Sequence, residues 1–139
     1  MWLVLAPALG AHAAEAVKLS EQDRVTLTAK LHSRQVDARV AAVQKLAQFP
    51  EEEAVKLIIK FGLRDASDLV RRPAYDALLS FKDNHAICDL LIDQLNQQAK
   101  QLRPDPSTPF LLCVLLSSSL PEVEKSSLRY VNERLSAAR

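Results

Sequence analysis

The sequence predicts an all-α fold in which antiparallel helix pairs stack side by side as an α-α superhelix. The first observation is an internal repeat: the pattern Arg-x-x-Ala-x-x-x-Leu-x-x-Phe starts at Arg39 and again, 32 residues later, at Arg71. A period of this length is typical of stacked repeats, whose units bury their apolar faces against each other. The second observation is composition. The 139 residues are 48% hydrophobic and include only 2 Gly, which indicates a globular, helix-rich chain.

Residues 1–16 are predicted to be an export leader outside the fold. Trp2–Leu9 is a short apolar run, and Ala11-His12-Ala13 fits the small-x-small pattern of a secretory cleavage site. The basic residues that usually precede such a run are missing, so an ordinary apolar N-terminal segment is the alternative. The run is too short to span a bilayer. We therefore expect a single repeat domain over residues 17–139, periplasmic or secreted in a bacterium if the leader is real and cytoplasmic otherwise.

The first helix is expected over residues 20–32, with Ser20 as its N-cap because a serine hydroxyl can accept from an early backbone amide. Leu27 lies one period before Ile59. The segment 19–32 therefore corresponds to the second helix of a repeat whose first helix is missing, as expected of a terminal cap.

The first complete unit is expected over residues 33–62. Apolar residues at helical spacing predict a helix over Val36–Gln48. Pro50 is predicted to open the second helix, because proline has no amide to leave unsatisfied at the first position. That helix is expected to end at Gly62.

The second unit is expected over residues 65–102. Its first helix spans about Leu69–Phe81, with Pro73 bending the first turns. Asp83 or Asn84 caps a second helix that runs from about His85 to Leu102.

The third unit, residues 108–138, follows a proline-rich linker, Arg103–Pro109. The apolar stretch from Phe110 to Ser118 is short enough to be a strand, but a buried helix fits its helical neighbours better. The last helix is expected after Pro121, running to about Ala138. Its apolar residues are Val123, Leu128, Val131 and Leu135. The total is seven helices, one cap helix and three antiparallel pairs.

The segment Leu63-Arg64-Asp65-x-x-x-x-Val70-Arg71-x-x-Ala74-x-x-x-Leu78 resembles a HEAT repeat. The copy before it has Ser33 in place of the acid. The resemblance covers about 65 residues and fades in the C-terminal third. Its 32-residue spacing is similar to that of short bacterial HEAT-like, armadillo-type repeats. The Trp, Gly and Tyr positions of the tetratricopeptide repeat are not matched.

The resemblance implies a HEAT-like solenoid that acts as a non-catalytic protein-interaction scaffold and binds a protein through a concave face. Second helices typically line that face in the family. The polar residues that the resemblance places there are Lys56, Lys60, Asp89, Asp93 and Gln97.

Arg39 and Arg71 are the most distinctive polar residues of the repeat. They could contact a ligand, but a position that recurs together with the core favours a structural role between repeats. A guanidinium with five donors is suited to bridging loops. The candidate acceptors are Asp37, Asp65, Asp68 and loop carbonyls.

The sequence offers two smaller candidate sites. His85, Cys88 and Asp89 share one helix face at a spacing that metal ligands can have. A metal site needs three or four converging ligands and the sequence shows no second cluster, so no metal or cofactor is expected. Cys88 and Cys113 are the only cysteines. An exported chain could pair them, but two free thiols are the favoured interpretation.

Other function classes find little support. No phosphate loop, nucleophile elbow or His-Glu-x-x-His motif is present, so the sequence does not predict an enzyme. Nucleic-acid binding is disfavoured by 18 basic against 17 acidic residues and 5% aromatic residues, although a basic strip could form. The residues of that strip are Lys56, Lys60, Arg64, Arg71 and Arg72. A second alternative is a helical accessory domain of a larger exported enzyme.

Overall fold

The structure, a computed structural model, describes residues 18–138, and all regular secondary structure in that range is helical. The helices are α2 (Glu21–Leu31), α3 (Val36–Leu46), α4 (Glu52–Leu57), η1 (Ile58–Leu63), α5 (Asp68–Ser80), α6 (His85–Ala99), α7 (Thr108–Leu116) and α8 (Pro121–Ala137). The π-helical η1 continues α4 without a break. The all-α prediction is confirmed, and the strand alternative for residues 110–118 is wrong. The predicted leader lies outside the described residues.

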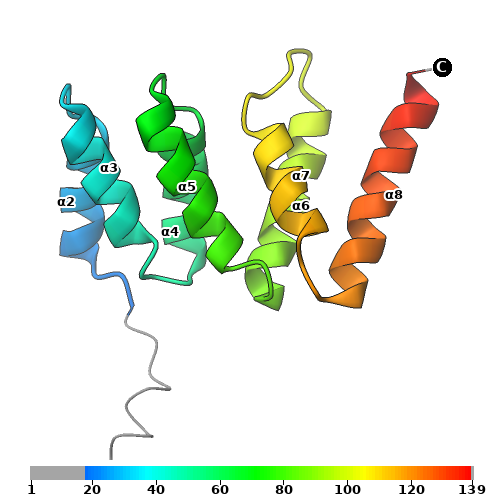
Figure 1. Cartoon of the computed structure of the whole chain (residues 1–139), viewed down its shortest axis with the longest axis horizontal. Coiled ribbons are helices and arrows are strands. Elements are labelled where there is room, and N and C mark those ends of the chain that lie inside the picture. Colours follow the sequence, from blue (N-terminus) through cyan, green and yellow to red (C-terminus); the bar gives the residue numbers. More distant parts are fainter. Residues whose placement is uncertain (1–17, 139) are drawn as a thin grey trace, which may run out of the picture.

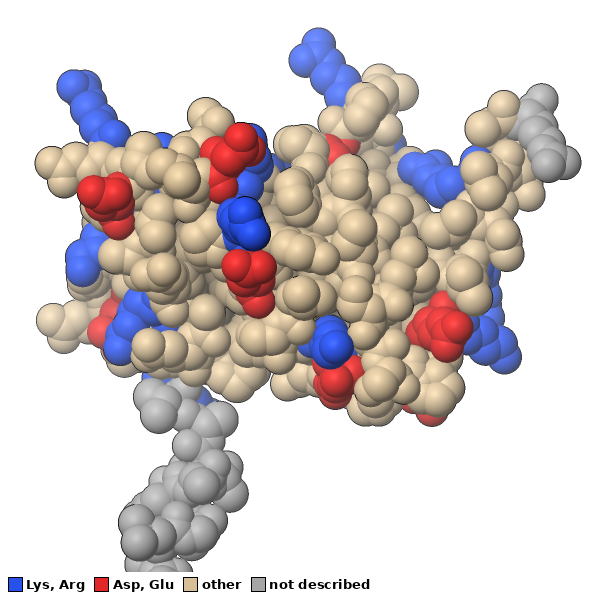
Figure 2. Space-filling model, in the orientation of Figure 1, with Lys and Arg blue, Asp and Glu red and all other residues tan. Residues whose placement is uncertain are grey.

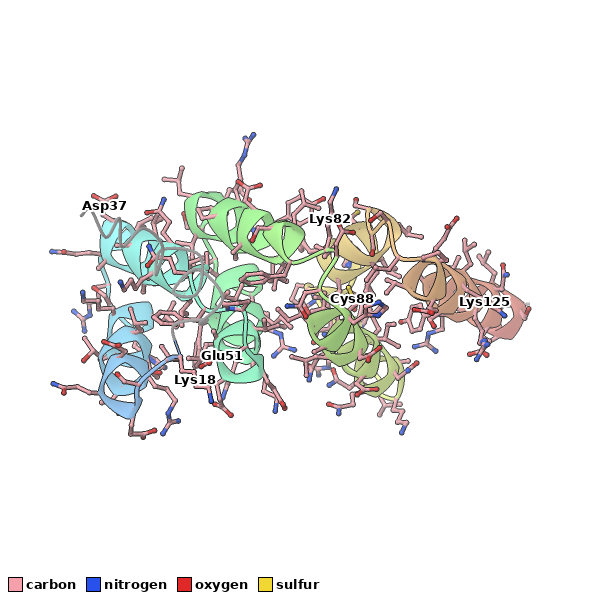
Figure 3. The ribbon with its side chains drawn as sticks, turned by 90° about the horizontal axis from the view of Figure 1, so that it is seen from below. Lys18, Asp37, Glu51, Lys82, Cys88 and Lys125 are labelled. Carbon is pink, nitrogen blue, oxygen red and sulfur yellow. The ribbon has the colours of Figure 1, made fainter. Side chains whose placement is uncertain are left out.

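The helices form a stack of two layers that runs along the molecule (Figure 1). Helices α3, α5 and α7 make the front layer, while α2, α4–η1 and α6 lie behind them (Figures 1 and 3). Helix α8 packs against both α6 and α7 and closes the far end of the stack. One cap helix and three antiparallel pairs were predicted, and the structure has this arrangement.

The residues that define the repeat form the core. Ala42, Leu46 and their equivalents one period later, Ala74 and Leu78, have no solvent exposure. Phe49 and Phe81 are buried at the same ends of their helices. The identical letters of the two copies therefore mark the surfaces through which neighbouring pairs pack.

Most of the predicted caps are present. The Ser20 hydroxyl accepts from the Asp23 amide at 3.0 Å, and the Asn84 side chain accepts from the Ile87 amide at 3.2 Å. Pro121 opens α8, as predicted. The prediction for Pro50 is wrong, because Glu51 is extended and serves as the N-cap residue, so α4 begins at Glu52, two residues later than predicted.

Gly62 does not terminate its helix. It lies inside η1 and has no positive φ, and the helix continues to Leu63. A Cβ at Gly62 would stand 2.6 Å from the Cβ of Ala74, closer than real Cβ atoms approach. The glycine is therefore needed for the close packing of η1 on α5.

The C-terminal third departs most from the predicted boundaries. Helix α6 ends at Ala99, with Lys100 as its C-cap, and α7 begins at Thr108. Of the apolar residues in α8, Val123 is buried, whereas Leu128 and Leu135 are exposed. Residues 100–107 form a long loop at the top of the stack (Figure 1).

Candidate interaction surface

Arg39 connects two neighbouring helix pairs. Its Nε donates to Asp65 Oδ2 at 2.7 Å and its Nη2 to Oδ1 at 3.1 Å, while Nη1 donates to the Ser33 carbonyl at 2.8 Å. The side chains of Arg39 and Asp65 are only 16% and 7% exposed. Such a two-point, shielded ion pair fixes the orientation of both groups and leaves little of either for a ligand.

Arg71 repeats only part of this arrangement. Its Nη1 donates to the Asp65 carbonyl at 2.6 Å, which matches the contact of Arg39 with Ser33. Its Nη2 pairs with the exposed Asp68 on the same helix. Asp37 is exposed at the outer edge of the front layer (Figure 3) and forms no ion pair within residues 18–138.

Asp105 holds the equivalent place in the third pair, and sequence analysis missed it. Arg64 Nη2 pairs with Asp105 Oδ2 at 2.6 Å, and the Ser107 amide donates to Oδ1 at 2.9 Å. The Ser67 amide donates to Asp65 Oδ1 in the same way, at 2.8 Å. The shared signal is Asp-x-Ser just before a first helix.

The loop around Asp105 continues into a buried polar network. The Ser107 hydroxyl donates to Asp105 at 2.6 Å and accepts from Gln98 Nε2 at 2.8 Å, and Thr108 donates to Gln98 Oε1 at 2.6 Å. Burial raises the pKa of the Asp105 carboxyl, but the donors from Ser107 and Arg64 outweigh that effect and leave the pKa below its usual value. The network fixes the loop of residues 100–107 to α6 and α7.

Carboxylates also connect neighbours along the opposite edge of the stack, where the loops before the second helices lie. Glu51 accepts from the Leu19 amide at 3.1 Å, close to the start of the described chain (Figure 3). Asp83 accepts from the amide and hydroxyl of Ser119, both at 2.8 Å, and these hydrogen bonds lower the pKa of Asp83. Both acids stand just before a second helix. Cross-links therefore run along both edges of the stack that are formed by the loops.

The predicted binding residues are exposed on the second helices. Lys56 and Lys60 lie on α4–η1, and the other three, Asp89, Asp93 and Gln97, lie on α6. Lys56 pairs with Glu52 at 2.5 Å, which raises the lysine pKa, and Lys60 Nζ lies 5.2 Å from the ring centroid of Phe61. The structure therefore places all five on one layer, as separate surface groups and not as a converging cluster.

Two grooves open on the described surface. The first, of about 610 Å³, lies between α3 and α5 and includes Leu69, Arg72 and Asp76. The second, which we call the C-terminal groove, has about 600 Å³. It is lined by the end of α6, the loop 100–105, α7 and the last turns of α8. The sequence predicts neither groove, because a groove depends on how the helices are set against each other.

The structure does not bring together the residues of the candidate metal site or of the candidate disulfide. His85 Nδ1 lies 3.7 Å from Glu122 Oε2, and within residues 18–138 no group of three or more His, Cys, Asp or Glu could hold a metal. Cys88 is buried, donates to the Lys82 carbonyl at 3.1 Å and has its pKa raised by burial. Cys113 is exposed, and both thiols are free.

Comparison with known proteins gives one match. A family model described as HEAT repeats covers residues 25–108, from α2 to the start of α7. No curated protein and no solved structure matches the chain. Over residues 18–138, the helices lack the combination of length and apolar character that crossing a bilayer requires.

Proposed function

Because the chain belongs to the HEAT-repeat family, we propose that it is a non-catalytic scaffold that binds a protein partner through the face formed by its second helices. HEAT repeats generally mediate protein–protein interaction. The observation that carries the proposal is that charged groups in the loops and charged groups on the second helices have different surroundings. Those at the loop ends are used between neighbouring pairs, whereas those on α4–η1 and α6 are exposed.

The charge distribution supports a protein partner over a nucleic acid. On the face drawn in Figure 2, basic and acidic side chains alternate and do not form a continuous basic surface. A surface of mixed sign offers specific pairing to a partner protein, while phosphate binding requires a basic surplus. If binding fails to weaken as salt is raised, phosphate-led recognition is excluded.

The test starts with affinity capture from the source organism's envelope fraction, followed by titration of the purified prey. We expect Lys56→Glu with Lys60→Glu to weaken the partner's affinity about tenfold, because both charges lie on the proposed face. Arg72→Glu, on the other layer, is the matched control. The face is wrong if the control weakens binding and the double variant does not.

Capture also tests the accessory-domain alternative. Mass spectrometry of the bait would then show a longer chain that carries a catalytic region. A bait of 139 residues or fewer with a specific prey supports the scaffold.

A further inference from the structure

The C-terminal groove opens along one face of α8. Val123, Ser127, Tyr130 and Arg134 recur every three or four residues and therefore share that face. Val123 and Ser127 are buried, whereas Tyr130 is half-buried and Leu135, beside this row, is 61% exposed. The same face is covered over the first half of the helix and open over the second half.

The lining of the groove is mainly apolar. Leu102 has a fully exposed side chain at one rim, and Leu135 lies on the α8 side. Leu112, Tyr130 and Val131 complete the apolar surface between them. Exposed apolar side chains that gather around one concavity mark a binding site, and about 600 Å³ is within the range of known ligand pockets.

The polar part of the lining is positive. Asp105 is the one carboxylate among the lining residues, and it is engaged by Arg64 and Ser107. Arg103 and Arg134 also line the groove, and neither forms an ion pair with a carboxylate within residues 18–138. On the face drawn in Figure 2, basic side chains project at the 100–107 loop and beside α8, with uncharged surface over α7 between them.

Arg134 is positioned across the opening. Its Nη2 donates to the Ala99 carbonyl at 2.8 Å, at the end of α6, and its guanidinium lies 5.7 Å from the centroid of the Tyr130 ring. A guanidinium has five N–H donors, so the others remain available to an acidic group. A bound carboxylate would meet an oriented cation beside apolar surface, where charge-assisted hydrogen bonds are strong.

We propose that the C-terminal groove binds an amphipathic helix of the protein partner, with apolar residues at i, i+3 or i+4 and i+7 and acidic residues beside them. Apolar anchors would fill the lining around Leu112 and Val131, and the acids would face Arg103 and Arg134. This is the helix-in-groove mode of recognition. The inference rests on the proposed scaffold function and names the chemistry of its partner.

The test uses the full chain and a fluorescent synthetic peptide of about four helical turns, with Leu at the apolar positions and Glu beside them. The matched control peptide has Lys at every Glu position. In fluorescence anisotropy we expect the acidic peptide to bind at least about tenfold more tightly than the basic one. Arg103→Glu with Arg134→Glu should reverse that preference, and Leu135→Asp should weaken both. The charge-matched variant Arg72→Glu with Lys125→Glu alters exposed residues outside the lining and should leave the preference unchanged.

Three outcomes would overturn the proposal. Both peptides could bind equally, neither could bind, or the Arg103 and Arg134 reversals could change nothing in a variant whose circular dichroism shows it folded. Self-association that Leu135→Asp abolishes would assign the groove to a second copy of the chain instead. A failed peptide, together with a purified partner that still depends on Lys56 and Lys60, would refute this groove and leave the scaffold function standing.

Discussion

Asp65 is shared by arginines from two neighbouring helix pairs. Its carboxylate accepts two hydrogen bonds from Arg39, and its backbone carbonyl accepts one from Arg71. The carboxylate also caps the turn before α5 by accepting from the Ser67 amide. One residue therefore fixes both the junction between pairs and the start of the next helix.

Replacing Asp65 with Ala should lower the free energy of unfolding by about 3–5 kcal/mol, because it leaves the shielded Arg39 guanidinium without its counter-ion. Urea unfolding followed by circular dichroism measures the change. Glu21→Ala is the control, since its ion pair with Arg24 lies on the surface and should contribute nothing measurable. Equal effects of the two substitutions would contradict a structural role for Asp65.

Leu46→Ala and Leu78→Ala should each cost about 2–5 kcal/mol of unfolding free energy, because both side chains are fully buried at equivalent positions of the repeat. Leu69→Ala, at a leucine that is 68% exposed, should stay within about 0.5 kcal/mol of the parent protein. Chemical denaturation of the three variants measures these changes in the free energy of unfolding. A large loss from Leu69→Ala alone would show that the repeat register is misplaced.

Gly62→Ala should destabilise the protein by about 1–3 kcal/mol, although alanine is the better helix former. The new methyl group would collide with Ala74, which closes the space on α5. Thermal unfolding measures the loss. The pair Gly62→Ala with Ala74→Gly should recover part of it, and a stabilising Gly62→Ala would refute the close contact.

Asp105→Asn should flatten the dependence of stability on pH. The pKa of Asp105 is lowered in the folded protein, so its ionised contacts with Arg64 and Ser107 stabilise the fold above the unfolded-state pKa of about 3.9. That stabilisation is lost as the pH falls through the lower folded-state pKa. Urea unfolding at pH 7 and near pH 3 should show a larger drop for the parent protein than for the variant. Parallel curves for the two proteins would contradict the prediction.

One thiol should react much faster than the other. Cys113 is exposed, whereas Cys88 is buried, donates to the Lys82 carbonyl and has its pKa raised by burial, so little reactive thiolate forms. Maleimide labelling with peptide mass spectrometry should find Cys113 modified in the native protein and Cys88 only after unfolding. Cys113→Ser should abolish the fast phase.

The sequence was informative where the 32-residue period holds. Arg39 with Arg71 and Leu46 with Leu78 recur in register, and buried residues are bound to their positions by packing, so the copies predict the helix pairs and their core. Polar contacts followed less directly. Asp65, Asp37 and Asp68 were all proposed as acceptors, and which of them Arg39 contacts depends on the conformation of the loops between the helices.

The C-terminal third was beyond the same reasoning. Asp105 follows Asp65 by 40 residues, so the longer α6 and its loop hide the equivalence from any search at a fixed period. The groove at α8 was missed for another reason. Whether Val131 or Leu135 is covered depends on the angle at which the last helix meets its neighbours, and an apolar pattern does not encode that angle.

The cross-links at the loops join segments from separate helix pairs or the cap, Asp65 and Asp105 along one edge of the stack and Glu51 and Asp83 along the other. Asp105 reaches furthest, because its partner Arg64 directly follows η1 of the first complete pair, whereas the other three contact the pair or cap next to their own. A pull or twist applied at α8 would pass along the molecule as small rotations at these junctions. The stack would respond as a short elastic spring, with its compliance set by the packed core at each junction together with these four acidic side chains.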